Sequence, residues 1–200
     1  MAAGTDAPDT GVMGGVEVRE ASAADACGLA QVQTQSWREA YQGLVSAGFL
    51  TALQVDPRVW TQRLTGSGPL TATLVAIADS RVVGFAGVGP QLPPDGDPRV
   101  GHLYTLYLLA RWWGAGIGHR LHTAALDALT CAGFGSAVLW VLDGNSRAIA
   151  FYEREGWRFD GGSRTEHMGG AESLAELRMS RRLDLGAEGA ELVKTHQDGR

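Results

Sequence analysis

The sequence is poor in cysteine. Its 200 residues include only Cys27 and Cys131, and neither belongs to a Cys-x-x-Cys pair or a Cys/His cluster. Because zinc sites are built from such groups, no metal site is expected. Both cysteines are interpreted as free thiols in a reducing cytoplasm and as small core residues on helices.

Long apolar runs are also missing. No segment approaches the roughly 18 to 20 consecutive apolar residues that a membrane-spanning helix requires. The first fifteen residues, MAAGTDAPDTGVMGG, carry neither a basic stretch nor an apolar one, so no signal peptide is expected. The chain is therefore predicted to be cytoplasmic, with no membrane partner.

Basic residues are too few for a nucleic-acid-binding surface. The chain has 17 lysines and arginines against 22 acids, a net charge of −5, and Lys194 is its only lysine. A surface that binds many phosphates should be clearly basic, so nucleic acid is excluded as a partner. Any bound anion must instead be held locally, by a few groups.

Turn residues divide the chain into strand and helix patterns. Residues 1–14 and 184–200 are expected to be disordered tails, and residues 15–183 to form one domain. A hairpin and two strand–helix–strand units follow an N-terminal strand and several helices, which predicts an α/β (α+β) fold with a mixed sheet. Residues 160–173 are expected to be a polar loop. The expected strands cover residues 16–20, 71–78, 81–88, 100–109, 136–142 and 174–183, and a further strand is expected to begin at 157–159. One expected helix follows Ser22, and the others cover residues 47–53, 57–64, 117–132 and 146–155.

The segment Trp113–His119 (WGAGIGH) joins an expected strand to an expected helix. Its glycines allow the backbone to approach a ligand closely. The first turn of the helix offers unpaired N–H groups at the positive end of the helix dipole. Together these features predict a site for a diphosphate-sized anion that does not depend on a basic surface.

Two other nucleotide-binding patterns fit this segment less well. A P-loop requires Gly-Lys-Ser/Thr, which the sequence does not contain. The dinucleotide fingerprint G-x-G-x-x-G matches at Gly114 and Gly116, but its last position is His119, and no acidic residue follows in the right context. Binding of NAD would favour this alternative.

A third pattern fits, because the chain resembles the GNAT family, the GCN5-related N-acetyltransferases, over roughly residues 16–183. The family's turn reads Arg/Gln-Gly-x-Gly-x-Gly/Ala between a long strand and a long helix. Here it reads Trp113-Gly114-Ala115-Gly116-Ile117-Gly118, and Trp113 departs from the usual Arg or Gln. A second block, residues 138–156, matches the family's strand, the following Asn145, and a helix that contains Phe-Tyr-Glu.

The resemblance implies a mostly antiparallel sheet flanked by helices, in which two central strands splay apart. It also implies that acetyl-coenzyme A is the acetyl donor. The free strand edge at Leu106, Tyr107 and Leu108 would bind the pantetheine arm, and Asn145 would hold that arm from the other side. The diphosphate would lie on the turn formed by Trp113, Gly114, Ala115, Gly116, Ile117, Gly118 and His119, with Arg111, Arg120 and Arg147 as candidates for the outer phosphates.

The same resemblance suggests catalytic residues. Tyr152, in Phe-Tyr-Glu, would be the acid that protonates the leaving thiolate. His102 lies on the long strand where many relatives carry Glu, and the ordinary histidine pKa of ~6.5 suits a general base. A histidine satisfied by a partner on the strand is the alternative for His102, and His167 is a weaker candidate base. His119 is expected to bond a phosphate, and His122 to lie at the surface.

Trp37 and Tyr41 end the first expected helix, which lines the acceptor side in this family, so both are candidate substrate residues. Core packing is the alternative for Trp37. The prediction is an enzyme that moves the acetyl group of acetyl-coenzyme A to a primary amine of a small molecule or peptide, by direct attack in a ternary complex. A non-catalytic acyl-coenzyme A-binding sensor or partner module is the alternative. Homodimers are common in the family and are a further expectation.

Overall fold

The computed structural model describes residues 15–66, 71–92, 96–97, 99–167 and 173–184. The expected tails, apart from Asp184, lie outside the described residues. A seven-stranded sheet forms the centre of the domain, in the order β1-β2-β3-β4-β5-β7-β6. Its strands are β1 (Glu17–Glu20), β2 (Ala72–Ala78), β3 (Arg81–Pro90), β4 (Gly101–Leu108), β5 (Ser136–Leu142), β6 (Arg158–His167) and β7 (Ser173–Arg182). The helices are α1 (Ala26–Ala40), α2 (Ala47–Ala52), α3 (Pro57–Thr65), α4 (Ile117–Cys131) and α5 (Ser146–Arg154), with short 3₁₀ turns at Ala23–Asp25 and Ala110–Trp112.

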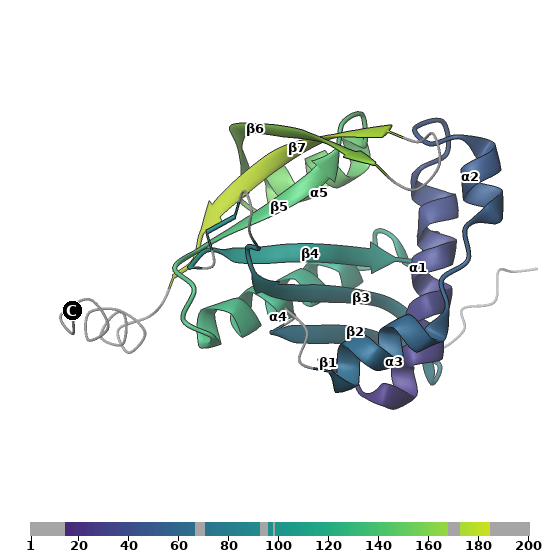
Figure 1. Cartoon of the computed structure of the whole chain (residues 1–200). Helices are drawn as coiled ribbons and strands as arrows, with labels where there is room; N and C mark the ends of the chain where they lie inside the picture. Colours follow the sequence, from purple (N-terminus) through teal and green to yellow (C-terminus); the bar gives the residue numbers. More distant parts are fainter. Residues whose placement is uncertain (1–14, 67–70, 93–95, 98, 168–172, 185–200) are drawn as a thin grey trace, which may run out of the picture.

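Helices cover both faces of the sheet (Figure 1). On one face, α1 and α3 pack over β2 and β3 through a cluster that includes Leu29, Trp60 and Phe85. On the opposite face, Ile117 and Leu121 of α4 pack against the same two strands. Each helix can do this because its apolar residues recur at helical spacing and form one stripe. The predicted fold class, a mixed sheet flanked by helices, is confirmed.

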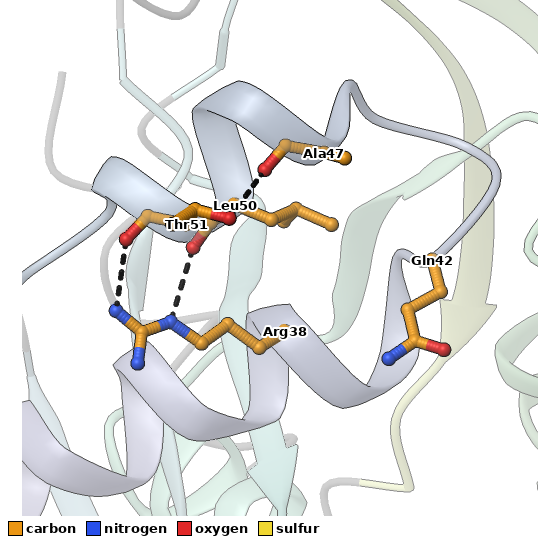
Figure 2. Close-up of a pocket in the computed structure, with 5 residues that line it drawn as sticks. All are labelled: Arg38, Gln42, Ala47, Leu50 and Thr51. Atoms are coloured by element: carbon orange, nitrogen blue, oxygen red, sulfur yellow. Dashed lines mark hydrogen bonds between the residues drawn. The ribbon is translucent and has the colours of Figure 1, made fainter.

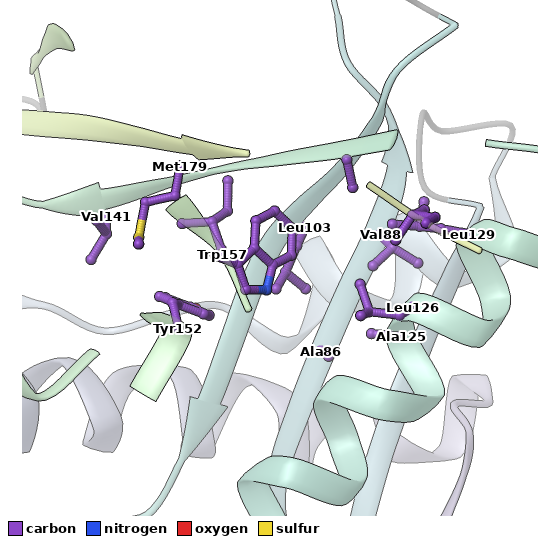
Figure 3. Close-up of a cluster of buried hydrophobic side chains, with 13 residues drawn as sticks. Ala86, Val88, Leu103, Ala125, Leu126, Leu129, Val141, Tyr152, Trp157 and Met179 are labelled. Carbon is purple, nitrogen blue, oxygen red and sulfur yellow. The ribbon is translucent and has the colours of Figure 1, made fainter. Parts of the chain in front are cut away.

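The core continues where α4 and α5 meet the strands β3, β4, β5 and β7 (Figure 3). Leu129 of α4, Tyr152 of α5 and Met179 of β7 belong to this cluster, with Trp157 beside them. Leu129, Met179 and Trp157 are fully buried. The cluster therefore fixes both helices against the part of the sheet that holds β4 and β5.

Pairing between β4 and β5 stops almost as soon as it begins. These neighbours are the parallel pair of the sheet, and their register joins only Gly101 to Ala137 and His102 to Val138. The two strands splay apart beyond His102, as the resemblance implied. On its other side β4 pairs with β3 along its length, apart from a bulge that leaves Tyr104 without a partner. Beyond His102, the edge of β4 that faces β5 is therefore unpaired, although it lies inside the sheet.

The loop expected at residues 160–173 is wrong over residues 160–167, which belong to β6. This strand pairs with β7, and the guanidinium of Arg164 lies 2.7 Å from the carboxylate of Glu176 across the pair. Most residues of β6 are exposed, so the segment lacks the alternation of apolar and polar residues that predicts a strand. Residues 168–172 of that expected loop lie outside the described residues, and its last residue, Ser173, begins β7.

The expected burial of the cysteines is also wrong. Cys27 lies on α1 and Cys131 ends α4, so both are on helices, but both are exposed free thiols. On α1 the inward positions are taken by Ala26, Leu29 and Ala30. Among the described helices, none is both long and apolar enough to cross a membrane.

Replacement of Leu129 tests the core that holds α4 to the sheet. Leu129 is fully buried and packs directly over Gly101, at the start of β4. Leu129→Ala should lower the free energy of unfolding by about 2–5 kcal/mol, because it removes buried methyl groups and leaves a cavity. Urea denaturation would measure this change. Val59→Ala on α3, where the side chain is 39% exposed, is the control, and an equal effect of both variants would contradict the prediction.

Candidate active site

The turn between β4 and α4 has the geometry of an anion-binding turn. Gly114 and Gly116 have φ angles of 77° and 76°, in the left-handed region that favours glycine. Gly116 is also the N-cap of α4, and its carbonyl accepts from the amide of Arg120 at 3.1 Å. The amides of residues 117–119 therefore have no acceptor within the helix and lie at the positive end of its dipole. No atom lies within 4 Å of a Cβ added at either glycine, so the turn faces open space.

Trp113, which stands where the family usually has Arg or Gln, ties this turn to both sides of the splay. Its indole Nε1–H donates to the carbonyl of Leu108 at 2.9 Å. The guanidinium carbon of Arg147, on the first turn of α5, lies 4.0 Å from the centre of the indole ring. The indole is neutral and its N–H is already bonded to Leu108, so Trp113 replaces neither the charge nor the donors of an arginine. Arg147 supplies a cation at that position instead, held by a cation–π contact.

The expected cofactor residues on β4 and α5 lie on opposite sides of the splay. Leu106, Tyr107 and Leu108 follow the last paired residue of β4, so their main chain is not paired with β5. Asn145 is the N-cap of α5, and its side-chain oxygen accepts from the amide of Ala148 at 3.2 Å. The cap fixes the orientation of the Asn145 amide at the mouth of the splay.

Tyr152 lies in the core cluster on the α5 side of the sheet and is only 9% exposed (Figure 3). Burial raises the pKa of its hydroxyl well above the ordinary tyrosine value, and the nearby hydroxyl of Tyr107 raises it further. Tyr152, like an exposed tyrosine, is protonated at neutral pH, and the raised pKa makes it a weaker proton donor than an exposed tyrosine.

Trp37, Tyr41 and Tyr107 form an aromatic wall on the α1 side of the sheet. The indole N–H of Trp37 donates to the hydroxyl of Tyr107 at 2.9 Å, and the Trp37 and Tyr41 rings meet edge to face with centres 4.8 Å apart. Burial raises the pKa of Tyr107 to about 12, although the Trp37 hydrogen bond opposes this shift. Trp37 is buried in a cluster that joins α1 and α2 to the sheet, while Tyr41 is partly exposed beside it.

His102 is the last residue of β4 that pairs with β5, so it lies at the apex of the splay. It is 9% exposed, and its Nδ1 is buried without a hydrogen-bond partner among the described residues. Burial, together with a smaller contribution from the charge of Arg164, lowers the pKa of His102 to about 4. The imidazole is therefore neutral at pH 7 and has a free nitrogen, which the expected alternative of a partner-satisfied histidine would not provide.

The two candidate catalytic residues lie on opposite faces of the sheet. Val138, the partner of His102, shares its face with Leu142, two pleats further along β5. Leu142 packs with Trp37 of α1, so His102 lies on the α1 face. Tyr152 instead packs with Leu139 and Val141 on the α5 face. A ligand in the splay would therefore have His102 on one side and Tyr152 on the other.

The expectation that His122 lies at the surface is wrong, because its side chain is 1% exposed. Its Nε2 accepts from the indole N–H of Trp157 at 2.8 Å, and its Nδ1 lies 3.3 Å from the carboxylate of Glu155. Burial lowers the pKa of His122 to about 4, against the opposing charge of Glu155. His119, one turn earlier on α4, lies 3.0 Å from the same carboxylate. This network joins α4 to the end of α5, and its residues do not stand out in the sequence.

A separate pocket of about 430 Å³ lies between α1 and α2 (Figure 2). The guanidinium of Arg38 donates to the carbonyls of Leu50 at 3.0 Å, Thr51 at 3.3 Å and Leu53 at 2.7 Å. These bonds satisfy the last carbonyls of α2 and hold that helix beside Tyr41. Arg38 was not singled out in the sequence, where nothing distinguishes it from a solvated charge. Within the described part of the chain, no group of three His, Cys, Asp or Glu side chains could hold a metal ion.

Comparisons with known proteins agree with this geometry. Residues 34–157 match the model of the acetyltransferase (GNAT) family. The chain is 31% identical over 141 residues to the uncharacterized N-acetyltransferase YuaI of Bacillus subtilis, an alignment that covers 69% of this chain and 78% of the relative. Its fold is similar to that of the ribosomal-protein-alanine N-acetyltransferase of Brucella melitensis, with a TM-score of 0.67, 22% identity, and coverage of 84% of this chain and 99% of the other. The PaiA N-acetyltransferase of Thermoplasma acidophilum, solved with coenzyme A, is also similar, with a TM-score of 0.60, 22% identity, and coverage of 84% and 99%.

Both buried histidines should remain neutral well below the ordinary histidine pKa of 6.5, because burial lowers the pKa of His102 and of His122 to about 4. Long-range ¹H–¹⁵N NMR spectra recorded over an acid titration would follow both rings, and should place the proton of neutral His122 on Nδ1. In the unfolded chain each ring takes up its proton near pH 6.5, so folding stability should fall as pH drops from about 6.5 towards 4. A midpoint near 6.5 for either folded-state ring would contradict the prediction.

Proposed function

Because the chain belongs to the GNAT family of acetyltransferases, we propose that it transfers the acetyl group of acetyl-coenzyme A to a primary amine, by direct attack in a ternary complex. The observation that carries this proposal is the splay of β4 and β5 beyond His102. The splay opens beside the glycine turn and runs between two candidate proton-transfer residues. Relatives that are named N-acetyltransferases support the reaction class.

In this proposal the cofactor lies along the splay. The amides of residues 117–119 would hold the diphosphate, since they are unpaired within α4. The free edge at residues 106–108 would hydrogen-bond the amide groups of the pantetheine arm, and Asn145 would hold the arm from the α5 side. Arg147, fixed on Trp113, would compensate for the missing arginine of the turn. Two of the similar solved structures, those with coenzyme A and with acetyl-coenzyme A, support this cofactor.

The acceptor must attack as a neutral amine, although an alkyl ammonium has a pKa of ~10.4. His102 would take the proton that the nitrogen loses as the nitrogen–carbon bond forms. Burial keeps His102 neutral and ready to accept it, at the cost of making it a weaker base. Tyr152 would give its proton to the thiolate that leaves as the carbon–sulfur bond breaks. An N–H on the free edge of β4 would bind the carbonyl oxygen as it gains charge.

Cofactor binding is tested by calorimetric titration of acetyl-coenzyme A into the purified protein, with NAD titrated in parallel. Acetyl-coenzyme A should bind and NAD should not. Gly116→Asp should weaken the binding by about 100-fold or more, because it adds a negative charge at the anion site and a side chain at a left-handed position.

The control for this titration is Gly48→Ala in α2, where an added Cβ meets no neighbour. Normal binding to Gly116→Asp, or binding of NAD alone, would refute the proposed cofactor site. Tight binding of acetyl-coenzyme A without transfer to any amine of a broad panel would instead favour a non-catalytic binding module.

Tyr152→Phe and His102→Gln separate the two proton transfers. With an acceptor that is turned over, Tyr152→Phe should lower kcat by about 100-fold, since it removes the acid without changing the packing of the ring. His102→Gln should lower kcat/KM for the acceptor and change the acid limb of its pH profile. Release of coenzyme A thiol would measure both. Wild-type kcat in Tyr152→Phe would exclude it as the acid, and an unchanged pH profile in His102→Gln would exclude it as the base.

A further inference from the structure

An open groove of about 530 Å³ lies on the sheet at the end where β4 and β5 are still paired. Its volume is in the range of small-molecule sites. Four arginines line it, Arg158, Arg178, Arg181 and Arg182, together with a single carboxylate, Asp160. This local charge of +3 contrasts with the net charge of −5 of the whole chain.

Two of these arginines are held by neutral groups. Arg158 donates to the carbonyls of Glu153 at 3.1 Å and Trp157 at 2.8 Å, and Arg181 donates to the carbonyl of Glu155. Carbonyl oxygens fix a guanidinium in place without neutralising its charge. Arg158 therefore presents a positioned cation, with unused N–H groups, to the groove, and Arg181 holds its cation at the α5-side edge of the groove.

The remaining two arginines differ from each other. Arg178 donates to Asp160 at 2.9 Å and is therefore paired with a carboxylate. A Cβ at Gly162 would come within 2.7 Å of the Arg178 side chain, so this glycine leaves the space that the side chain occupies. The side chain of Arg182 forms no hydrogen bond or ion pair with any described residue. Three of the four positive charges are thus free of carboxylate partners within the described part of the chain.

Capping of α5 explains only part of this arrangement. Cations near the C-terminus of a helix are favourable, because they bind its last carbonyls and oppose its dipole. That effect accounts for Arg158 and Arg181, whose partners are carbonyls at the end of α5. It does not account for Arg178 and Arg182, which lie on β7 and converge on the same groove.

The groove adjoins the apex of the splay. Val138 lines it, and Val138 is paired with His102 in the parallel register. Paired residues of neighbouring strands place their side chains on the same face of the sheet. Val138 and His102 therefore lie on the α1 face, together with the groove's Arg182, and this is the face of the candidate substrate residues Trp37 and Tyr41. Arg181 pairs with Ala137 of the α5-side core and lines the groove from the opposite face.

We propose that this groove binds an anionic group of the acceptor, so that the substrate is an amine that also carries a phosphate or clustered carboxylates. This inference rests on the proposed function. Guanidinium groups match both kinds of anion through paired N–H bonds, and positioned arginines bind them with little loss of side-chain freedom. The paired strands at the apex separate the groove from the glycine turn at the opposite end of β4, so the anion is not the diphosphate of the cofactor.

Direct binding is tested by calorimetric titration of inorganic pyrophosphate into protein saturated with acetyl-coenzyme A. Binding should be weakened about tenfold or more in Arg158→Gln/Arg182→Gln, two exposed positions whose replacement does not open the core. It should be unchanged in Arg81→Gln, a matched control on the exposed β2–β3 hairpin, and retained in Gly116→Asp. No binding, or loss of binding in Gly116→Asp alone, would overturn the anion site.

The role in acceptor choice is tested with two peptides, Ala-Glu-Glu and Ala-Gln-Gln, and with ethanolamine phosphate against ethanolamine. We expect kcat/KM to favour the anionic member of a pair by about tenfold. The preference should vanish in Arg158→Gln/Arg182→Gln and persist in Arg81→Gln. The pair that shows the preference identifies a carboxylate or a phosphate as the preferred anion.

Equal use of charged and neutral acceptors by the wild type would refute the inference. Pyrophosphate binding at the groove without acetylation of any amine would refute the proposed function and leave the anion site standing.

Discussion

The structure depends on a parallel strand pair that is left incomplete. Beyond His102, β4 and β5 no longer exchange hydrogen bonds, and unpaired backbone groups inside a protein are costly. Such an edge persists only where water or a ligand satisfies it. The separation of two central strands thus creates an extended site within the sheet. The glycine turn, the capped start of α5 and the two candidate proton-transfer residues all border this gap between β4 and β5.

The two halves of the sheet must then be held together by side chains. One connection is the core cluster, in which α4 and α5 pack against both halves. A second is the buried network in which Glu155 contacts His119 and His122 of α4, and Trp157 donates to His122. A third is the stacking of Arg147 on Trp113 at the mouth of the splay. These contacts lie outside the splay itself, so they keep its walls in register without filling the space between them.

Much of this arrangement could be predicted from the sequence, because local rules governed it. The helix after the glycine turn, the hairpin of β2 and β3 and the splayed strands follow from periodicity, turn residues and a resemblance carried by two motifs. The start of β6 was predicted, but its continuation over residues 160–167 was missed because both of its faces are largely exposed, so β7 rather than burial determines its conformation. The burial of His122 and the arginine groove were missed for a related reason. Each depends on residues far apart in the chain, such as Arg158 and Arg182, that only the tertiary fold brings together.

The positive groove and His102, the proposed base, would act on the same proton. Positive charge near the apex disfavours cationic forms there, and the charge of Arg164, which lies outside the groove, already lowers the pKa of His102. The same field would lower the pKa of an acceptor ammonium that entered the splay, and so would increase the fraction of neutral, nucleophilic amine. A weaker base is then tolerable, because the proton it must accept is held less tightly. The positive groove would repel the ammonium group of an acceptor. An anionic group on the same acceptor would be attracted to the groove, would offset this repulsion, and would bring the amine to the apex.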